Sequence, residues 1–176
     1  MVLSRSEPGI GAHARIRTGD LLLTKEMLCH LSYVGGDSTD FICYILNARF
    51  MPTISDLLEA ARRRYLRVTP QEAALEQADG ALLVDTRTSE QRSRDGVIPG
   101  ALAIDRTVFE WRLDPTSPTR IPEAANHEVR LIVICAQGFS SSLAAASLLD
   151  LGLTNATDVI GGFEAWKEAG LPVERV

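Results

Sequence analysis

Residues 131–149 read Leu131-Ile132-Val133-Ile134-Cys135-Ala136-Gln137-Gly138-Phe139-Ser140-Ser141-Ser142-Leu143-Ala144-Ala145-Ala146-Ser147-Leu148-Leu149. The first four residues are all apolar and three are β-branched, which predicts a short strand buried on both faces. A glycine-containing loop follows. Three consecutive serines are then candidate N-caps for an Ala/Leu-rich segment of high helix propensity that reaches Asp150. This stretch therefore predicts a buried strand, a tight loop and a covering helix.

Cys135 lies where this strand ends and the helix is about to begin. The first turn of a helix carries unpaired N–H groups and a partial positive charge. Such a position lowers the pKa of a cysteine from about 8.5 to between about 3.5 and 7.5, so that the thiolate is the resting form. The alternative is a buried cysteine that acts as a small apolar residue. The strand-end position, Gly138 and the serine cluster favour the reactive thiolate.

Three further apolar segments, residues 81–85, 101–104 and 156–160, have the pattern of short strands. Helical segments alternate with them, among them one that starts at the capping box Thr69-Pro70-Gln71-Glu72 and one from Phe163 to Ala169. This alternation predicts parallel pairing with right-handed crossovers. The expected fold class is α/β, a three-layer α/β/α sandwich around a mainly parallel sheet of about five strands. Ligands of such sheets bind beyond the carboxyl ends of the strands, which is where Cys135 lies.

The chain divides at about residue 50. In residues 1–50, five basic residues balance five acidic ones and no amphipathic stripe forms. We expect a weakly ordered N-terminal extension there, or a start codon assigned too far upstream, with Met51 as the alternative first residue. Residues 51–176 are the expected domain, preceded by an amphipathic helix in which Ile54, Leu57 and Leu58 share one face.

Composition excludes several classes of protein. The 176-residue chain has a formal net charge of −5, which argues against binding to nucleic acid. Three cysteines without metal-ligand spacing predict no metal, and we expect no cofactor. They also favour the reducing cytoplasm. No apolar run reaches the length of about 18 residues that a membrane span needs, so no membrane partner is expected.

The loop sequence from Cys135 to Ser141 resembles the active-site loop of the rhodanese-like sulfurtransferases. Two other segments are similar to the same family: Asp85-Thr86-Arg87 with Gly96-Val97-Ile98-Pro99-Gly100-Ala101, and Gly161-Gly162-Phe163-Glu164-Ala165-Trp166 with Gly170-Leu171-Pro172-Val173. The resemblance spans about residues 69–175 and implies that Cys135 carries a sulfane sulfur as a persulfide. It also implies that the backbone of the loop binds the substrate, through Ala136, Gln137, Gly138, Phe139, Ser140 and Ser141. Asp85 and Arg87 are interpreted as a structural salt bridge that supports the loop.

The chain departs from the family pattern at two places. Val97 stands where a histidine is usual, and Phe139 and Ser140 stand where members that use thiosulfate often have Lys or Arg. An anion must then be held by backbone N–H groups, by the Ser140 or Ser141 hydroxyl, or by an arginine from elsewhere. The candidate arginines are those around the proline-rich loop: Arg106, Arg112 and Arg120.

The predicted function is a single-domain sulfurtransferase with a small sulfur donor and a thiol, protein or cyanide acceptor. A first alternative is a non-catalytic module that recognises a partner or senses oxidation through Cys135. A second alternative is the phosphatase relative of this fold, whose loop ends in an arginine that holds phosphate. Neither Ser140 nor Ser141 is an arginine, which disfavours it.

Overall fold

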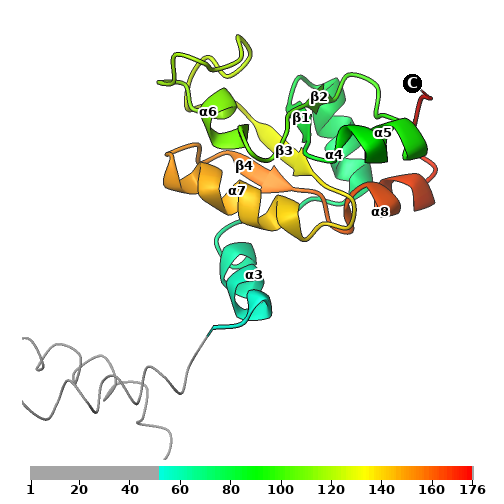
Figure 1. Cartoon of the computed structure of the whole chain (residues 1–176), viewed down its shortest axis with the longest axis horizontal. Coiled ribbons are helices and arrows are strands. Elements are labelled where there is room, and N and C mark those ends of the chain that lie inside the picture. Colours follow the sequence, from blue (N-terminus) through cyan, green and yellow to red (C-terminus); the bar gives the residue numbers. More distant parts are fainter. Residues whose placement is uncertain (1–51, 176) are drawn as a thin grey trace, which may run out of the picture. The chain divides into compact units, whose positions relative to one another are not determined.

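A sheet of four parallel strands forms the centre of the molecule (Figure 1). The strands are β1 (Leu82–Asp85), β2 (Leu102–Ala103), β3 (Leu131–Ile134) and β4 (Ala156–Asp158), in the order β2-β1-β3-β4. The computed structural model describes residues 52–175. The predictions of weak order over residues 1–50 and of a start at Met51 lie outside these described residues. The predicted α/β class and parallel pairing are confirmed.

The expected number of about five strands was wrong by one. The described residue nearest to a fifth strand is Val68, which forms an isolated parallel bridge with Val159 beyond β4. The segment cannot continue as a strand, because Thr69 caps a helix and Pro70 begins it. Proline has no N–H to extend a ladder, and its fixed φ suits the first helical position.

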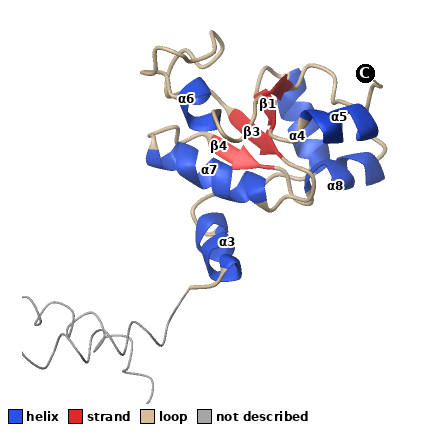
Figure 2. Cartoon of the chain, viewed as in Figure 1, coloured by secondary structure: helices blue, strands red, loops and turns tan. Residues whose placement is uncertain are grey.

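Helices cover both faces of the sheet and make the predicted three layers (Figure 2). One face packs against α6 (Phe109–Leu113) and α7 (Ser140–Asp150). The other face packs against α4 (Pro70–Ala78) and α8 (Gly162–Glu168). Strand β3 shows why: Leu131 and Val133 enter the first core and Ile132 and Ile134 the second, all fully buried, because side chains alternate across a strand.

Two more helices complete the described part. Helix α5 (Ser89–Asp95) follows β1, and helix α3 (Ile54–Arg62) precedes α4. Helix α3 starts with a capping box between Thr53 and Asp56, and its packing partner is α7. Within residues 52–175, no helix has both the length and the apolar character required to cross a lipid bilayer.

The register of the strands gathers polar residues at one edge of the sheet. Asp85 ends β1, Asp158 ends β4, and Cys135 directly follows β3 between them. Asp85 pairs with Ile134 and Val133 pairs with Asp158, so these strand ends are level. Parallel strands therefore place a thiol and two carboxylates at the same carboxyl edge.

Candidate functional site

The Cys135 sulfur lies at the N-terminus of α7, and the residue is only 5% exposed. The backbone N–H of Ser141 donates to Sγ at 3.3 Å, and the Ser141 hydroxyl oxygen lies 3.2 Å from Sγ. The predicted strand, loop and helix are all present, with the helix beginning at Ser140. The chain thus surrounds one buried sulfur with the polar groups of a helix start.

The surroundings of the sulfur lower the pKa of the Cys135 thiol below its ordinary value. Burial acts in the opposite direction and is the largest single influence, because it penalises the charged form. Hydrogen bonds from the Ser140 and Ser141 side chains and from the backbone N–H groups of Ser141 and Gln137 outweigh it together. The site therefore favours the thiolate through hydrogen bonds.

The serines do not cap the helix as expected. The N-cap residue is Phe139, which makes no side-chain cap, and Ser140 is the first helical residue. The hydroxyls of Ser141 and Ser142 instead both donate to the buried carboxylate of Asp158, each at 2.9 Å. A buried carboxylate needs hydrogen-bond donors, and the two hydroxyls supply them, so these side chains point inward.

Asp158 is the centre of a buried polar network that the sequence analysis did not anticipate. Its side chain is fully buried and accepts from Arg67 Nε at 2.7 Å and Arg67 Nη2 at 2.9 Å. The Tyr65 hydroxyl donates to the same carboxylate at 3.1 Å. Burial, and then the negative charge of Asp158, raise the pKa of Tyr65, so its hydroxyl stays protonated and remains a donor.

Ser141 links this network to the sulfur. Its hydroxyl carries a single proton, which is directed to Asp158 while its oxygen faces Cys135 Sγ. Asp158 keeps donors from Ser142, Tyr65 and Arg67 when that proton is withdrawn. The hydroxyl can therefore rotate toward a thiolate and leave no unpaired buried charge behind.

The loop rests on the start of α8. The carbonyl oxygen of Cys135 accepts from the Phe163 N–H at 2.8 Å, and that of Ala136 accepts from the Glu164 N–H at 3.0 Å. A Cβ atom on Gly162, whose φ is +63°, would lie 2.4 Å from the Cys135 carbonyl oxygen. Only glycine permits this approach. The Gly161-Gly162 segment is thus the platform of the loop.

Two arginines reach the back of the loop, and they are not the predicted ones. The Arg62 guanidinium donates to Gly138 O at 2.7 Å and to Ser142 Oγ at 3.0 Å, and Arg67 Nη2 donates to the same carbonyl at 3.2 Å.

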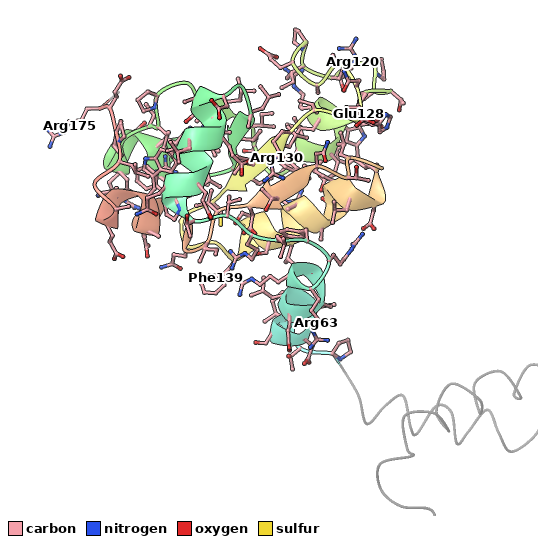
Figure 3. The ribbon with its side chains drawn as sticks, turned by 180° about the vertical axis from the view of Figure 1, so that it is seen from behind. Arg63, Arg120, Glu128, Arg130, Phe139 and Arg175 are labelled. Carbon is pink, nitrogen blue, oxygen red and sulfur yellow. The ribbon has the colours of Figure 1, made fainter. Side chains whose placement is uncertain are left out.

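The expectation that Arg106, Arg112 or Arg120 supplies charge to the loop was wrong. Arg106 pairs with Glu110, Arg112 donates to the Thr119 carbonyl, and Arg120 donates to the Ile121 carbonyl. Figure 3 shows Arg120 and Phe139 at opposite edges of the body formed by the sheet and its covering helices. Each of these three arginines thus binds a residue close to it in the chain and not the Cys135 loop.

Asp85 and Arg87 form a buried pair beside the loop. Arg87 Nη2 lies 2.7 Å from Asp85 Oδ2 and 2.9 Å from the Gly96 carbonyl oxygen, and its guanidinium stacks on the Phe163 ring at 3.4 Å. Among residues 52–175, Arg87 Nη1 has no hydrogen-bond partner. Both side chains are buried, so separating the two charges would leave each without water or a partner. The pair therefore holds the loop after β1 in one conformation.

A small hollow opens in front of the sulfur. Its volume is about 200 Å³. Of the loop residues, Gly138 and Ser141 are buried and do not line it. The lining residues are Thr86, Arg87, Gln91, Cys135, Ala136, Gln137, Phe139 and Ser140. The Gln137 side-chain amide donates a hydrogen bond to the Glu164 carboxylate at 3.0 Å, and Phe139 is 55% exposed. A small molecule that enters this hollow meets the Cys135 loop first.

The family model of the rhodanese-like domain matches residues 69–169. The chain belongs to the rhodanese-like domain family. It is 32% identical over 111 residues to the thiosulfate sulfurtransferase GlpE of Actinobacillus succinogenes. The aligned region covers 62% of this chain and 91% of that protein.

Two solved structures have a similar fold. A protein from Rhodopseudomonas palustris, described as a possible tyrosine phosphatase, is 33% identical with a TM-score of 0.65, over 71% of this chain and 96% of its own. A rhodanese-related protein from Thermoplasma volcanium is 26% identical with a TM-score of 0.50, over 62% of this chain and 97% of its own.

The departures of this rhodanese-like domain can now be placed. Val97 forms an antiparallel backbone bridge with Glu174 and is not among the residues that line the hollow in front of the sulfur. Phe139 and Ser140 are among the residues that line the hollow in front of Cys135. Asp158 was missed although it ends a buried strand at the carboxyl edge, a position that could have identified it.

Proposed function

We propose that this rhodanese-like domain is a sulfurtransferase in which Cys135 carries sulfane sulfur between a small donor and a thiol, protein or cyanide acceptor. The observation that carries the proposal is the position of Cys135 Sγ at the start of α7, with its pKa lowered by hydrogen bonds. The relatives named thiosulfate sulfurtransferase support the same reaction class. A cysteine of this kind belongs in a reducing compartment, for which we propose the cytoplasm.

The first half-reaction loads the enzyme. The Cys135 thiolate attacks the outer sulfur of the donor, a sulfur–sulfur bond forms, and the donor's own sulfur–sulfur bond breaks. With thiosulfate the leaving group is sulfite, which takes the electron pair of the broken bond. The product is a Cys135 persulfide anion, whose charge the N–H groups of the loop from Ala136 to Ser141 stabilise.

The second half-reaction unloads it. A nucleophile such as cyanide attacks the outer sulfur of the persulfide and leaves as thiocyanate, and the Cys135 thiolate is regenerated. Neither step needs a general base, because the first nucleophile is the thiolate, which the lowered pKa of Cys135 favours, and the second is the cyanide anion. In this mechanism Asp85 and Arg87 act by holding the loop, and Gly138 by giving it the left-handed turn it needs, at φ +72°.

The phosphatase alternative has less support. Arg87 is the one arginine that lines the hollow within residues 52–175, and it is held by Asp85 and by the Gly96 carbonyl. Bidentate binding of a phosphate needs a guanidinium whose donors face the site. The possible tyrosine phosphatase activity of the Rhodopseudomonas palustris protein is therefore not proposed for this chain.

A loading assay tests the proposal. The full chain is mixed with thiosulfate or glutathione persulfide, and its intact mass is measured before and after addition of cyanide. We expect one added sulfur atom on Cys135, its release as thiocyanate, and neither in Cys135→Ser. If the native protein accepts no sulfur from either donor but oxidises reversibly to a sulfenic acid, the redox-sensing module replaces the transferase.

A further inference from the structure

A second hollow lies next to the Cys135 loop, between α3 and the start of α7. It measures about 390 Å³ and is lined by Ile54, Ser55 and Leu58 of α3, Phe139 and Ser140 of the loop, and Leu143 of α7. Figure 3 shows Phe139 at the edge of the sheet and its covering helices that lies toward α3. Four of the six lining residues are large and apolar, and no charged residue is among them.

Two of the large apolar side chains that line this hollow are exposed to solvent. Ile54 is 66% exposed and Phe139 is 55% exposed, although both side chains are large. The Arg62 guanidinium lies 5.7 Å from the centre of the Phe139 ring and is itself fixed to Ser142 and to the Gly138 carbonyl. Phe139 is therefore held by a cation–π contact from one side, while its remaining surface is available to a ligand.

The two hollows are neighbours, because Phe139 and Ser140 line both the hollow at α3 and the hollow in front of the sulfur. The Ser140 side chain also contributes a hydrogen bond that lowers the pKa of Cys135, so it lies close to the reacting sulfur. A molecule whose sulfur reaches Cys135 can extend past Ser140 and place its remaining atoms against Phe139, Ile54 and Leu58.

We propose that this second hollow binds the apolar body of the sulfur donor, and that the donor is an organic sulfane-sulfur compound with an aliphatic or aromatic group. This inference rests on the sulfurtransferase proposed above. The apolar walls offer nothing to a small, strongly hydrated dianion such as thiosulfate, whereas each methylene group that they cover is removed from water.

A series of alkanethiosulfonates, R–SO2–S⁻, tests the proposal on the full chain. The Cys135 thiolate attacks the terminal sulfur, the bond between the two sulfur atoms breaks, and the alkanesulfinate R–SO2⁻ leaves with the electron pair. Cyanide then regenerates the thiolate as thiocyanate forms. The reacting group is constant along the series, and only the length of R changes from methyl to hexyl.

We expect kcat/KM to rise about two- to fourfold with each added methylene until the hollow is filled, the effect of burying one such group. Ile54→Gln should flatten this rise. The matched control is Leu57→Gln on the same helix, because Leu57 is 51% exposed but does not line the hollow. The control should keep the slope of the native protein.

The outcomes separate this inference from the proposed function. A chain that transfers sulfur from methanethiosulfonate but shows no dependence on chain length overturns the donor site and leaves the transferase intact. A dependence that persists in Ile54→Gln also overturns it. A chain that accepts sulfur from no member of the series overturns the donor site, and it contradicts the transferase as well when thiosulfate and glutathione persulfide also fail to load Cys135. Occupation of the hollow by a second copy or by another segment of the chain appears as the first of these outcomes.

Discussion

A single hydroxyl connects the sulfur of this rhodanese-like domain to its buried charges. Ser141 contacts both Cys135 Sγ and the Asp158 carboxylate, whereas Ser142 contacts Asp158 and the Gly138 carbonyl. The two serines are neighbours, both are fully buried, and each donates to the same carboxylate at 2.9 Å. They differ in whether they reach the sulfur, which makes them a matched pair.

Replacing Ser141 by Ala should raise the pKa of Cys135, because the variant lacks a hydroxyl that stabilises the thiolate, and a hydrogen bond to a charged group contributes about 1.5–3 kcal/mol. Ser142→Ala should leave that pKa where it is. The measurement is the rate of alkylation by iodoacetamide against pH. Equal shifts in the two variants would mean that the effect comes from general loosening of the loop.

The native protein has its own pH dependence. Hydrogen bonds lower the pKa of Cys135 against the opposing effect of burial, so the thiolate persists to a lower pH than in an ordinary cysteine. The alkylation rate should be constant above this lowered pKa and should fall about tenfold per pH unit below it, because the thiol is not the nucleophile. A midpoint at or above that of free cysteine contradicts the proposed role of the loop.

Asp158 opposes the thiolate that it helps to position. Its negative charge lies one hydroxyl away from the sulfur, so Asp158→Asn should lower the pKa of Cys135 further. The same change leaves Arg67 without its ion pair in a mostly buried place and should reduce the free energy of unfolding by about 3–5 kcal/mol.

The control for this variant is Glu76→Gln. Glu76 pairs with Arg130 at the same 2.7 Å distance, but both side chains are more than a third exposed. Its loss should cost under about 1 kcal/mol in a urea titration. If the two variants lose similar stability, the buried network around Asp158 stabilises the fold no more than an exposed ion pair does.

At the scale of elements, the site depends on the close approach of the Cys135 loop and the start of α8. Gly162 and Gly170 stand at the two ends of α8, with similar φ values of +63° and +69°. A Cβ on Gly162 would meet the Cys135 carbonyl oxygen at 2.4 Å, whereas a Cβ on Gly170 has nothing within 4 Å. The two positions share the backbone requirement and differ only in the contact.

Both alanine variants should therefore lose about 1–2 kcal/mol in the free energy of unfolding, because alanine is strained in the left-handed region. Gly162→Ala should lose about 1–3 kcal/mol more, because the loop must move away from the added methyl group. Thermal unfolding measures the stability, and alkylation of Cys135 reports on the loop. A Gly170→Ala variant that slows alkylation as strongly as Gly162→Ala would contradict the platform role.

At the scale of the whole described unit, stability is concentrated in the inner strands. Strand β3 lies between β1 and β4, and its four side chains are fully buried in the two cores. Helix α3 buries only Ala61. The unit thus combines a rigid sheet that carries Cys135 with a helix whose packing is slight.

Amide hydrogen exchange should reflect this difference. We expect the amides of β3 to exchange only through global unfolding and those of α3 to exchange at least about a hundredfold faster, because local opening energies range from near zero to the global value. Mass spectrometry of peptides from the two segments measures both. Equal protection of α3 and β3 would show that α3 is an integral part of the folding unit.

The sequence alone determined the α/β class, the parallel sheet, the position of Cys135 between a strand and a helix, and the family. These features depend on local patterns: runs of apolar residues, capping boxes and glycines a few positions apart. The number of strands was overestimated by one, since Val68 forms only one bridge before Pro70 begins a helix. The catalytic role of the loop remains a prediction that the proposed assays address.

Only the tertiary structure decided which charges stand behind the loop. Arg67 and Asp158 are 91 residues apart in the chain, and Arg62 and Gly138 are 76 apart. No local periodicity relates such pairs, because the folded sheet, and not the chain, brings α3 and the end of β4 to the back of the loop. The apolar hollow between α3 and Phe139 arises in the same way, since its walls come from segments that are neighbours only after folding.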